Sequence, residues 1–155
     1  MARTVRSGQA LAPIIRPAGA DDAGELAQLL GVLGYPCSRD EAAERIRRLL
    51  TDPDQCLLVA DVHGGLLGLV CFDLMYYLPL GATTCRITAL AVADGAQRRG
   101  LGRLLLREAE SRAREAGAVR IELTSASHRD QAHAFYRSCG YAESALRFLK
   151  RLGDA

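Results

Sequence analysis

Three strand patterns follow one another between residues 56 and 92, and this run constrains the fold more than any other feature of the chain. The segments are CLLVAD (56–61), LLGLVCFDLMYYL (66–78) and TTCRITALAV (83–92), and the turn VHGG (62–65) separates the first two. Runs of apolar and β-branched residues bounded by turn residues are typical of buried strands. The first two segments are therefore predicted to form a hairpin, and the third a further strand.

Helical patterns stand on both sides of this strand run. Asp22 and Glu25 precede leucines at helical spacing, which predicts a capped amphipathic helix, and Ser38 with Glu41 repeats the capping pattern before a second helix. The other predicted elements are a short first strand PIIRPA (13–18), a helix from Leu101 that ends at Gly117, a strand VRIELTS (119–125), a helix HRDQAHAFYRSC (128–139) that stops at Gly140, and a last strand ALRFLKRL (145–152).

The element order predicts an α/β (α+β) fold with a central mixed sheet of six to seven strands flanked by four helices. A chain of 155 residues suffices for one hydrophobic core, so we expect a flexible leader over residues 1–12 and a single domain over 13–155. No apolar run approaches the ~20 residues that a membrane-spanning helix needs, and the N-terminus lacks the pattern of a secretion signal. A cytoplasmic location is the expectation.

The charged and metal-binding residue types exclude several functions. The formal net charge is only +2, which argues against a general nucleic-acid-binding protein. The five cysteines form no C-x-x-C pair, and the three histidines also lack ligand spacing, so we expect reduced structural thiols and no metal site.

Positive charge and glycine are concentrated at the start of the helix that begins near Leu101. Three arginines, Arg98, Arg99 and Arg103, stand close to Gly100 and Gly102. A helix N-terminus already carries unpaired N–H groups and a positive dipole end, so further positive charge there is unfavourable. A phosphate bound to these backbone amides would explain the pattern, because glycine lets the backbone approach a ligand closely. A tight strand-to-helix turn without a ligand is the alternative. The segment lacks the Lys-Ser/Thr of a P-loop and the third glycine of a dinucleotide-binding loop.

Two motifs in this context resemble one known family. The segment ALAV (89–92) with QRRGLG (97–102) is similar to the central strand and pyrophosphate loop of the GCN5-related N-acetyltransferases, and AHAFYRSCGY (132–141) resembles their second motif. The resemblance covers residues 13–152. It implies transfer of an acetyl group from acetyl-CoA to a primary amine of a small molecule or a protein by direct attack. A catalytically silent CoA-binding regulatory module is the alternative.

The resemblance also implies roles for individual residues. Tyr136 aligns with the tyrosine that protonates the departing CoA thiolate, and a phenol is still protonated at neutral pH. The implied cofactor-binding residues are Leu90, Ala91 and Val92 for the pantetheine arm, Gln97, Arg98, Arg99, Gly100, Leu101, Gly102 and Arg103 for the phosphates, and Arg129, which stands where many relatives have a CoA-contacting asparagine.

The general base and the acceptor are not fixed by the resemblance. Thr124 and Arg86 stand where relatives place a catalytic glutamate, so the sequence leaves Glu122 and Asp73 as bases acting through water or as structural ion-pair partners. Three tyrosines could line the acceptor pocket, namely Tyr35, Tyr76 and Tyr77. We expect acetyl-CoA and an amine as partners, with no metal, nucleic acid or membrane, and leave open whether the protein forms a homodimer.

Overall fold

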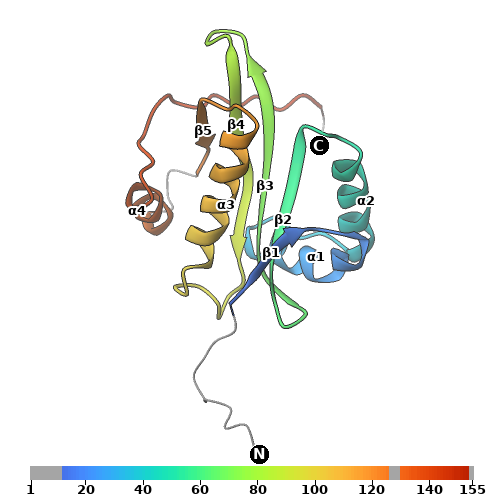
Figure 1. The fold of residues 1–155 in the computed structure, drawn as a ribbon. Helices are drawn as coiled ribbons and strands as arrows, with labels where there is room; N and C mark the ends of the chain where they lie inside the picture. The colour runs from blue at the N-terminus through green and yellow to red at the C-terminus, as the bar shows by residue number, and fades with distance from the viewer. Residues whose placement is uncertain (1–11, 126–129, 154–155) are drawn as a thin grey trace, which may run out of the picture. The chain divides into compact units, whose positions relative to one another are not determined.

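The computed structural model describes residues 12–125 and 130–153 of the chain (Figure 1). The chain divides into two compact units, Met1–Thr124 and Ser125–Ala155. The first unit contains β1 (Ile14–Pro17), a 3-10 turn η1 (Ala20–Asp22), α1 (Ala23–Val32), α2 (Arg39–Leu50), β2 (Gln55–Val62), β3 (Gly65–Tyr77), β4 (Ala82–Val92), α3 (Leu101–Glu115) and β5 (Arg120–Leu123). The second contains α4 (Asp130–Ser138).

The sheet is mixed, as predicted, and has five strands in the order β1-β2-β3-β4-β5. Neighbouring strands run antiparallel except β4 and β5, which are parallel because α3 connects them. The count of six to seven strands is not confirmed, because residues 145–152 do not form the predicted last strand. Leu146, Phe148 and Leu152 alternate as a strand requires, but all three are exposed. Alternation alone does not make a strand, since its backbone must also find a partner.

The two faces of the sheet are covered by different helices. Buried side chains of α1 and α2 pack with Leu69 and Cys71 of β3 in one core cluster. Gly68 points to the opposite face, where a Cβ atom would lie 2.9 Å from Cδ1 of Leu105 in α3 and 3.1 Å from the carbonyl oxygen of Ala91. The missing side chain therefore lets α3 pack unusually close to β3 and β4.

The predicted start of α2 is confirmed, whereas the predicted cap of α1 is wrong. The Ser38 hydroxyl accepts from the Glu41 N–H at 3.0 Å, and Glu41 accepts from the Ser38 N–H at 3.2 Å. Asp22, however, places no side-chain oxygen on the amides of α1. Glu25 accepts a hydrogen bond from the backbone N–H of Leu66 at 2.7 Å. These two carboxylates serve tertiary contacts that local spacing does not reveal.

Asp22 belongs to an ion-pair network with Arg16 and Asp61. Two Arg16 nitrogens each donate to Asp22 at 2.8 Å, and Arg16 Nε donates to Asp61 Oδ2 at 3.0 Å. The backbone N–H of Gly19 completes the coordination of Asp22 at 2.7 Å. The Arg16 guanidinium holds the pKa of Asp22 below its ordinary value. This network joins β1, η1 and β2 at the outer edge of the sheet.

Within residues 12–125 and 130–153, none of the helices combines the length and apolar character needed to cross a bilayer.

Candidate functional site

Strands β4 and β5 separate part of the way along β4. The two strands pair in parallel from Thr84 to Ile87, whereas β4 continues to Val92 without a β5 partner. Thr88 is an extra residue at this point, because Phe72 pairs with Ile87 and the preceding β3 residue pairs with Ala89. The outer edge of β4 from Thr88 to Val92 therefore offers backbone N–H and C=O groups to a ligand.

The predicted pantetheine-binding residues lie on this open stretch. Ala91 is buried in the core, while Leu90 and Val92 are half-buried. Along this stretch the backbone N–H and C=O groups of alternate residues point to the open edge, so both predictions for these residues, core packing and ligand contact, are compatible with the structure.

The loop that follows β4 leads into an uncapped helix start. Gly100 occupies the N-cap position of α3 with a left-handed φ of 78° and has no side chain to cap the first amides, and the first turn contains no acidic residue. Arg98 is also left-handed, with φ 69°. By contrast, α2 has both a Ser38 cap and acidic residues in its first turn. The free N–H groups and positive dipole end of α3 favour an anion.

The predicted phosphate-binding residues lie together at this helix start. In the part of the chain that the structure describes, exposed Arg98 and Arg99 have no acidic side chain within salt-bridge distance. Leu101 is buried and anchors the loop, and the Gln97 amide lies 3.5 Å from the carbonyl oxygen of Val92. Gly102 and Arg103 belong to the first turn of α3. The loop follows the open stretch of β4 directly in the chain.

A row of charged side chains crosses the sheet where the fork begins. Asp73, Arg86 and Glu122 are aligned partners on β3, β4 and β5 and therefore share one face. Glu122 Oε1 lies 3.1 Å from Arg86 Nε, and Glu122 Oε2 lies 3.7 Å from Arg120 Nη2. Arg120 also stacks over the ring of Tyr77, with its Cζ 4.5 Å from the ring centroid. Sequence reasoning missed Arg120, although its alternation with Glu122 on a predicted strand was a usable signal.

Tyr136 lies on α4 in the second unit. Its ring is half-buried, 5.4 Å from the Phe135 centroid and 6.2 Å from that of Tyr141. Arg129 lies outside the described residues. The structure therefore brings together the predicted site residues of the first unit. For Tyr136, in the second unit, it shows the ring contacts with Phe135 and Tyr141.

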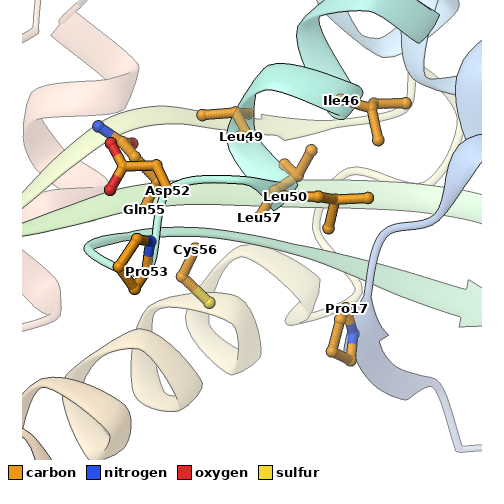
Figure 2. Close-up of a pocket in the computed structure, with 9 residues that line it drawn as sticks. All are labelled: Pro17, Ile46, Leu49, Leu50, Asp52, Pro53, Gln55, Cys56 and Leu57. Atoms are coloured by element: carbon orange, nitrogen blue, oxygen red, sulfur yellow. The ribbon is translucent and has the colours of Figure 1, made fainter.

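A small hollow of about 230 Å³ lies beside the start of β2 (Figure 2). Its lining is mostly apolar and contains none of the predicted site residues: Pro17, Ile46, Leu49, Leu50, Asp52, Pro53, Gln55, Cys56 and Leu57. Burial raises the pKa of the Cys56 thiol, so the one thiol that lines this hollow is held protonated. Binding pockets for small molecules are usually larger and contain several convergent polar groups.

Two further thiols, those of Cys71 and Cys85, have the same character. All five cysteines are free, and burial raises the pKa of Cys71 and brings that of Cys85 to about 12. No group of three metal-ligating side chains is found among the described residues.

Comparisons with known proteins support one assignment. Residues 25–141 match the model of the acetyltransferase (GNAT) family. The chain is 32% identical over 120 residues to the aminoalkylphosphonate N-acetyltransferase of Salmonella typhimurium strain LT2, which covers 77% of this chain and 75% of that protein. Its fold matches a transcriptional regulator from Bacillus halodurans C-125 with a TM-score of 0.84 and 24% identity, over 90% of this chain and 99% of the other. It also matches a GNAT family acetyltransferase from Staphylococcus aureus with a TM-score of 0.80 and 23% identity, over 92% and 100% of the two chains.

Proposed function

The chain belongs to the acetyltransferase (GNAT) family and is an acetyl-CoA-dependent N-acetyltransferase, and on that premise we propose that its acceptor is a small primary amine carrying a phosphonate or similar anionic group. The observation that carries this proposal is the relative that is 32% identical over three quarters of both chains and is named as an aminoalkylphosphonate N-acetyltransferase.

The charged row supplies a place for such a group. The guanidinium groups of Arg86 and Arg120 lie on one face of the sheet, share Glu122 and remain 46% and 41% exposed. Guanidinium groups bind phosphonate oxygens through charge-assisted hydrogen bonds. Arg120 is fixed in orientation by the Tyr77 ring, so less conformational freedom is lost when it binds an anion.

The cofactor would occupy the fork and the loop that follows β4. In this proposal the pantetheine arm pairs with the open β4 edge at Leu90, Ala91 and Val92, and the diphosphate binds the amides of residues 98–103. The α3 start without a capping side chain at Gly100 supports this placement, as do Arg98 and Arg99, for which no acidic partner is found among residues 12–125 and 130–153. A backbone N–H at the bulge near Thr88 would stabilise negative charge on the thioester oxygen during direct attack by the amine.

We propose Tyr136 as the acid that protonates the departing CoA thiolate. Tyr136→Phe retains the ring and so its contacts with Phe135 and Tyr141, but removes the hydroxyl. General acid catalysis supplies about 10²–10⁴-fold in rate, so we expect single-turnover acetyl transfer to fall at least 10²-fold while acetyl-CoA binding persists. Tyr141→Phe is the matched control. An unchanged single-turnover rate in Tyr136→Phe would show that the residue only packs.

The acceptor proposal is tested with a panel of amines and detection of released thiol. 2-Aminoethylphosphonate is compared with ethylamine and propylamine, which lack the anion, and with a peptide N-terminus. We expect kcat/KM for the phosphonate to exceed that for the alkylamines at least tenfold, as one or two charge-assisted hydrogen bonds allow. Arg120→Met should remove that preference, whereas Arg114→Met on the exposed end of α3 should not. Equal rates for all amines would contradict the proposal.

A further inference from the structure

Asp73 is the one charged residue of a long strand whose other residues are apolar, glycine or tyrosine. Strand β3 runs from Gly65 to Tyr77. The neighbour of Asp73 in this strand, Phe72, pairs with Ile87 of β4. Ile87 is the last β4 residue that pairs with β5 before the two strands separate. Its cross-strand partner Arg86 in turn pairs with Glu122. Two carboxylates therefore flank one guanidinium at the base of the fork.

The two carboxylates have different surroundings. Glu122 is 40% exposed, and each of its oxygens faces an arginine, at 3.1 Å and 3.7 Å. Asp73 Oδ1 is shielded from solvent and has no hydrogen-bond partner among the described residues. A buried carboxylate oxygen without a donor is costly, and such groups in a native structure call for an explanation. Glu122 is occupied by the arginines, whereas Asp73 retains an oxygen that can accept a proton.

Charged groups from three directions act on Asp73. Burial is the largest influence and raises the pKa of Asp73; Arg86 lowers it, while Glu122 and Asp52 raise it. The thiols of Cys71 and Cys85 lie near enough to respond to Asp73 and remain protonated. A raised pKa makes a carboxylate a better proton acceptor near neutral pH.

We propose that Asp73 is the general base of the reaction and receives the proton of the acceptor amine through one water molecule, with Arg86 as its positioning residue. This inference rests on the acetyl transfer stated above. As the amine nitrogen bonds to the thioester carbonyl carbon, the C–S bond breaks and its electron pair leaves with sulfur. The nitrogen gives up one proton, which passes through the water to Asp73, and the thiolate is protonated separately. Asp73 then loses its proton to solvent, so the enzyme is restored.

The test is the pH dependence of kcat/KM, measured with whichever amine of the panel the wild type acetylates best. In the wild type we expect activity to fall on the acid side as Asp73 becomes protonated. Asp73→Asn should lower kcat/KM at least 10²-fold and remove that acid limb, and Asp73→Glu should restore part of the rate. Glu122→Gln should keep the limb and move it to lower pH, because the charge of Glu122 raises the pKa of Asp73.

Two further measurements separate a base from a structural carboxylate. Removing a buried, unpartnered charge should leave the unfolding temperature of Asp73→Asn equal to or above that of the wild type at pH 7. Arg86→Met should move the acid limb to higher pH, since Arg86 lowers the pKa of Asp73, and this variant keeps Asp73 itself. The assignment would be overturned if Asp73→Asn kept the wild-type rate and the acid-side fall of kcat/KM. It would also be overturned if the pH of that fall were the same in Arg86→Met and Glu122→Gln as in the wild type. Absence of a phosphonate preference in the panel would instead count against the acceptor class alone.

Discussion

The arginine at the first strand and the arginines at the start of α3 have opposite surroundings. Arg16 has two carboxylates within 3.0 Å, and Asp22 is only 10% exposed in that network. Arg98 and Arg99 are exposed, and in the described part of the chain no acidic side chain pairs with either. The first arrangement is complete without a ligand. The second places positive charge beside the positive end of a helix, where a bound anion would be stabilising.

This difference separates two uses of the same side chain. In the Arg16 network the positive charge is compensated by carboxylates of the protein itself, so the guanidinium contributes to folding. In the loop after β4 the strain of a left-handed Arg98 and the repulsion near α3 are retained by the free protein. Acetyl-CoA binding would relieve that repulsion, which predicts that substitutions in the two regions change different measured quantities.

The largest expected effect is the loss of stabilisation by the cofactor. Acetyl-CoA at ~100 times its Kd should add about 2.7 kcal/mol to the free energy of unfolding of the wild type. Gly102→Glu places an acid in the first turn of α3, where it would repel the diphosphate and obstruct the amides. We expect no thermal shift with acetyl-CoA in this variant. Gly31→Glu, on α1 with open space around the site, is the control and should keep the shift. Equal shifts in the wild type and Gly102→Glu would refute the proposed phosphate site.

The second effect concerns folding without ligand. Arg16→Met leaves Asp22 buried without its cation, which costs ~3–5 kcal/mol for a fully buried pair. Because Arg16 is 36% exposed, we expect about 2 kcal/mol in chemical unfolding at pH 7. Arg45→Met, which breaks a pair exposed on both sides, should leave the unfolding midpoint nearly unchanged.

The pH dependence of Arg16→Met follows from the sign of the Asp22 shift. The pKa of Asp22 in the folded protein lies below its ordinary value of 3.8, so this contribution to stability is complete above that value and is lost as the pH falls through the folded pKa. The stability difference between wild type and Arg16→Met should therefore shrink below about pH 4. A difference that stays constant into the acid range would mean that packing, not charge, links Arg16 to Asp22.

The smallest expected effect is a gain, not a loss, in the free energy of unfolding. Arg98→Gly relieves a left-handed conformation that costs about 1–2 kcal/mol, while glycine loses about 0.5–1 kcal/mol more on folding, so we expect a net gain near 0.5 kcal/mol in the absence of ligand. Arg98→Ala removes the same guanidinium but keeps Cβ, and should show no gain from relief of strain. If both variants gain equally in urea unfolding, charge repulsion rather than backbone strain explains the effect.

The sequence predicted most elements because their signals are local. The capping box of Ser38 and Glu41, the buried strands and the glycine-arginine loop all depend on spacing within a few residues. The contacts of Asp22 with Arg16 and of Glu25 with Leu66 are tertiary, so the same acidic residues gave a wrong cap for α1. The predicted strand over 145–152 failed for a related reason, since its pairing depends on a partner far away in the chain.

The same contrast between local signals and tertiary contacts holds for the candidate site. A motif singled out the loop residues Gln97 to Arg103, and the structure places them at the start of α3, while their binding role stays a prediction. The difference between Asp73 and Glu122 was not visible in the sequence, because both are single acids on predicted strands. Only the structure shows that Glu122 lies near Arg86 and Arg120, whereas Oδ1 of Asp73 has no hydrogen-bond partner among the described residues.

Gly68 is not among the residues of the proposed site, yet it affects how closely α3 and β4 pack together. The helix that presents the amides and the strand that presents the open edge are held at their separation by the absence of one methyl group on a neighbouring strand, since a Cβ there would meet both Leu105 and the Ala91 carbonyl. Any larger side chain at this position would have to move α3 or β4. If the proposed cofactor site is right, a substitution at Gly68 would therefore change the affinity for acetyl-CoA without touching the ligand.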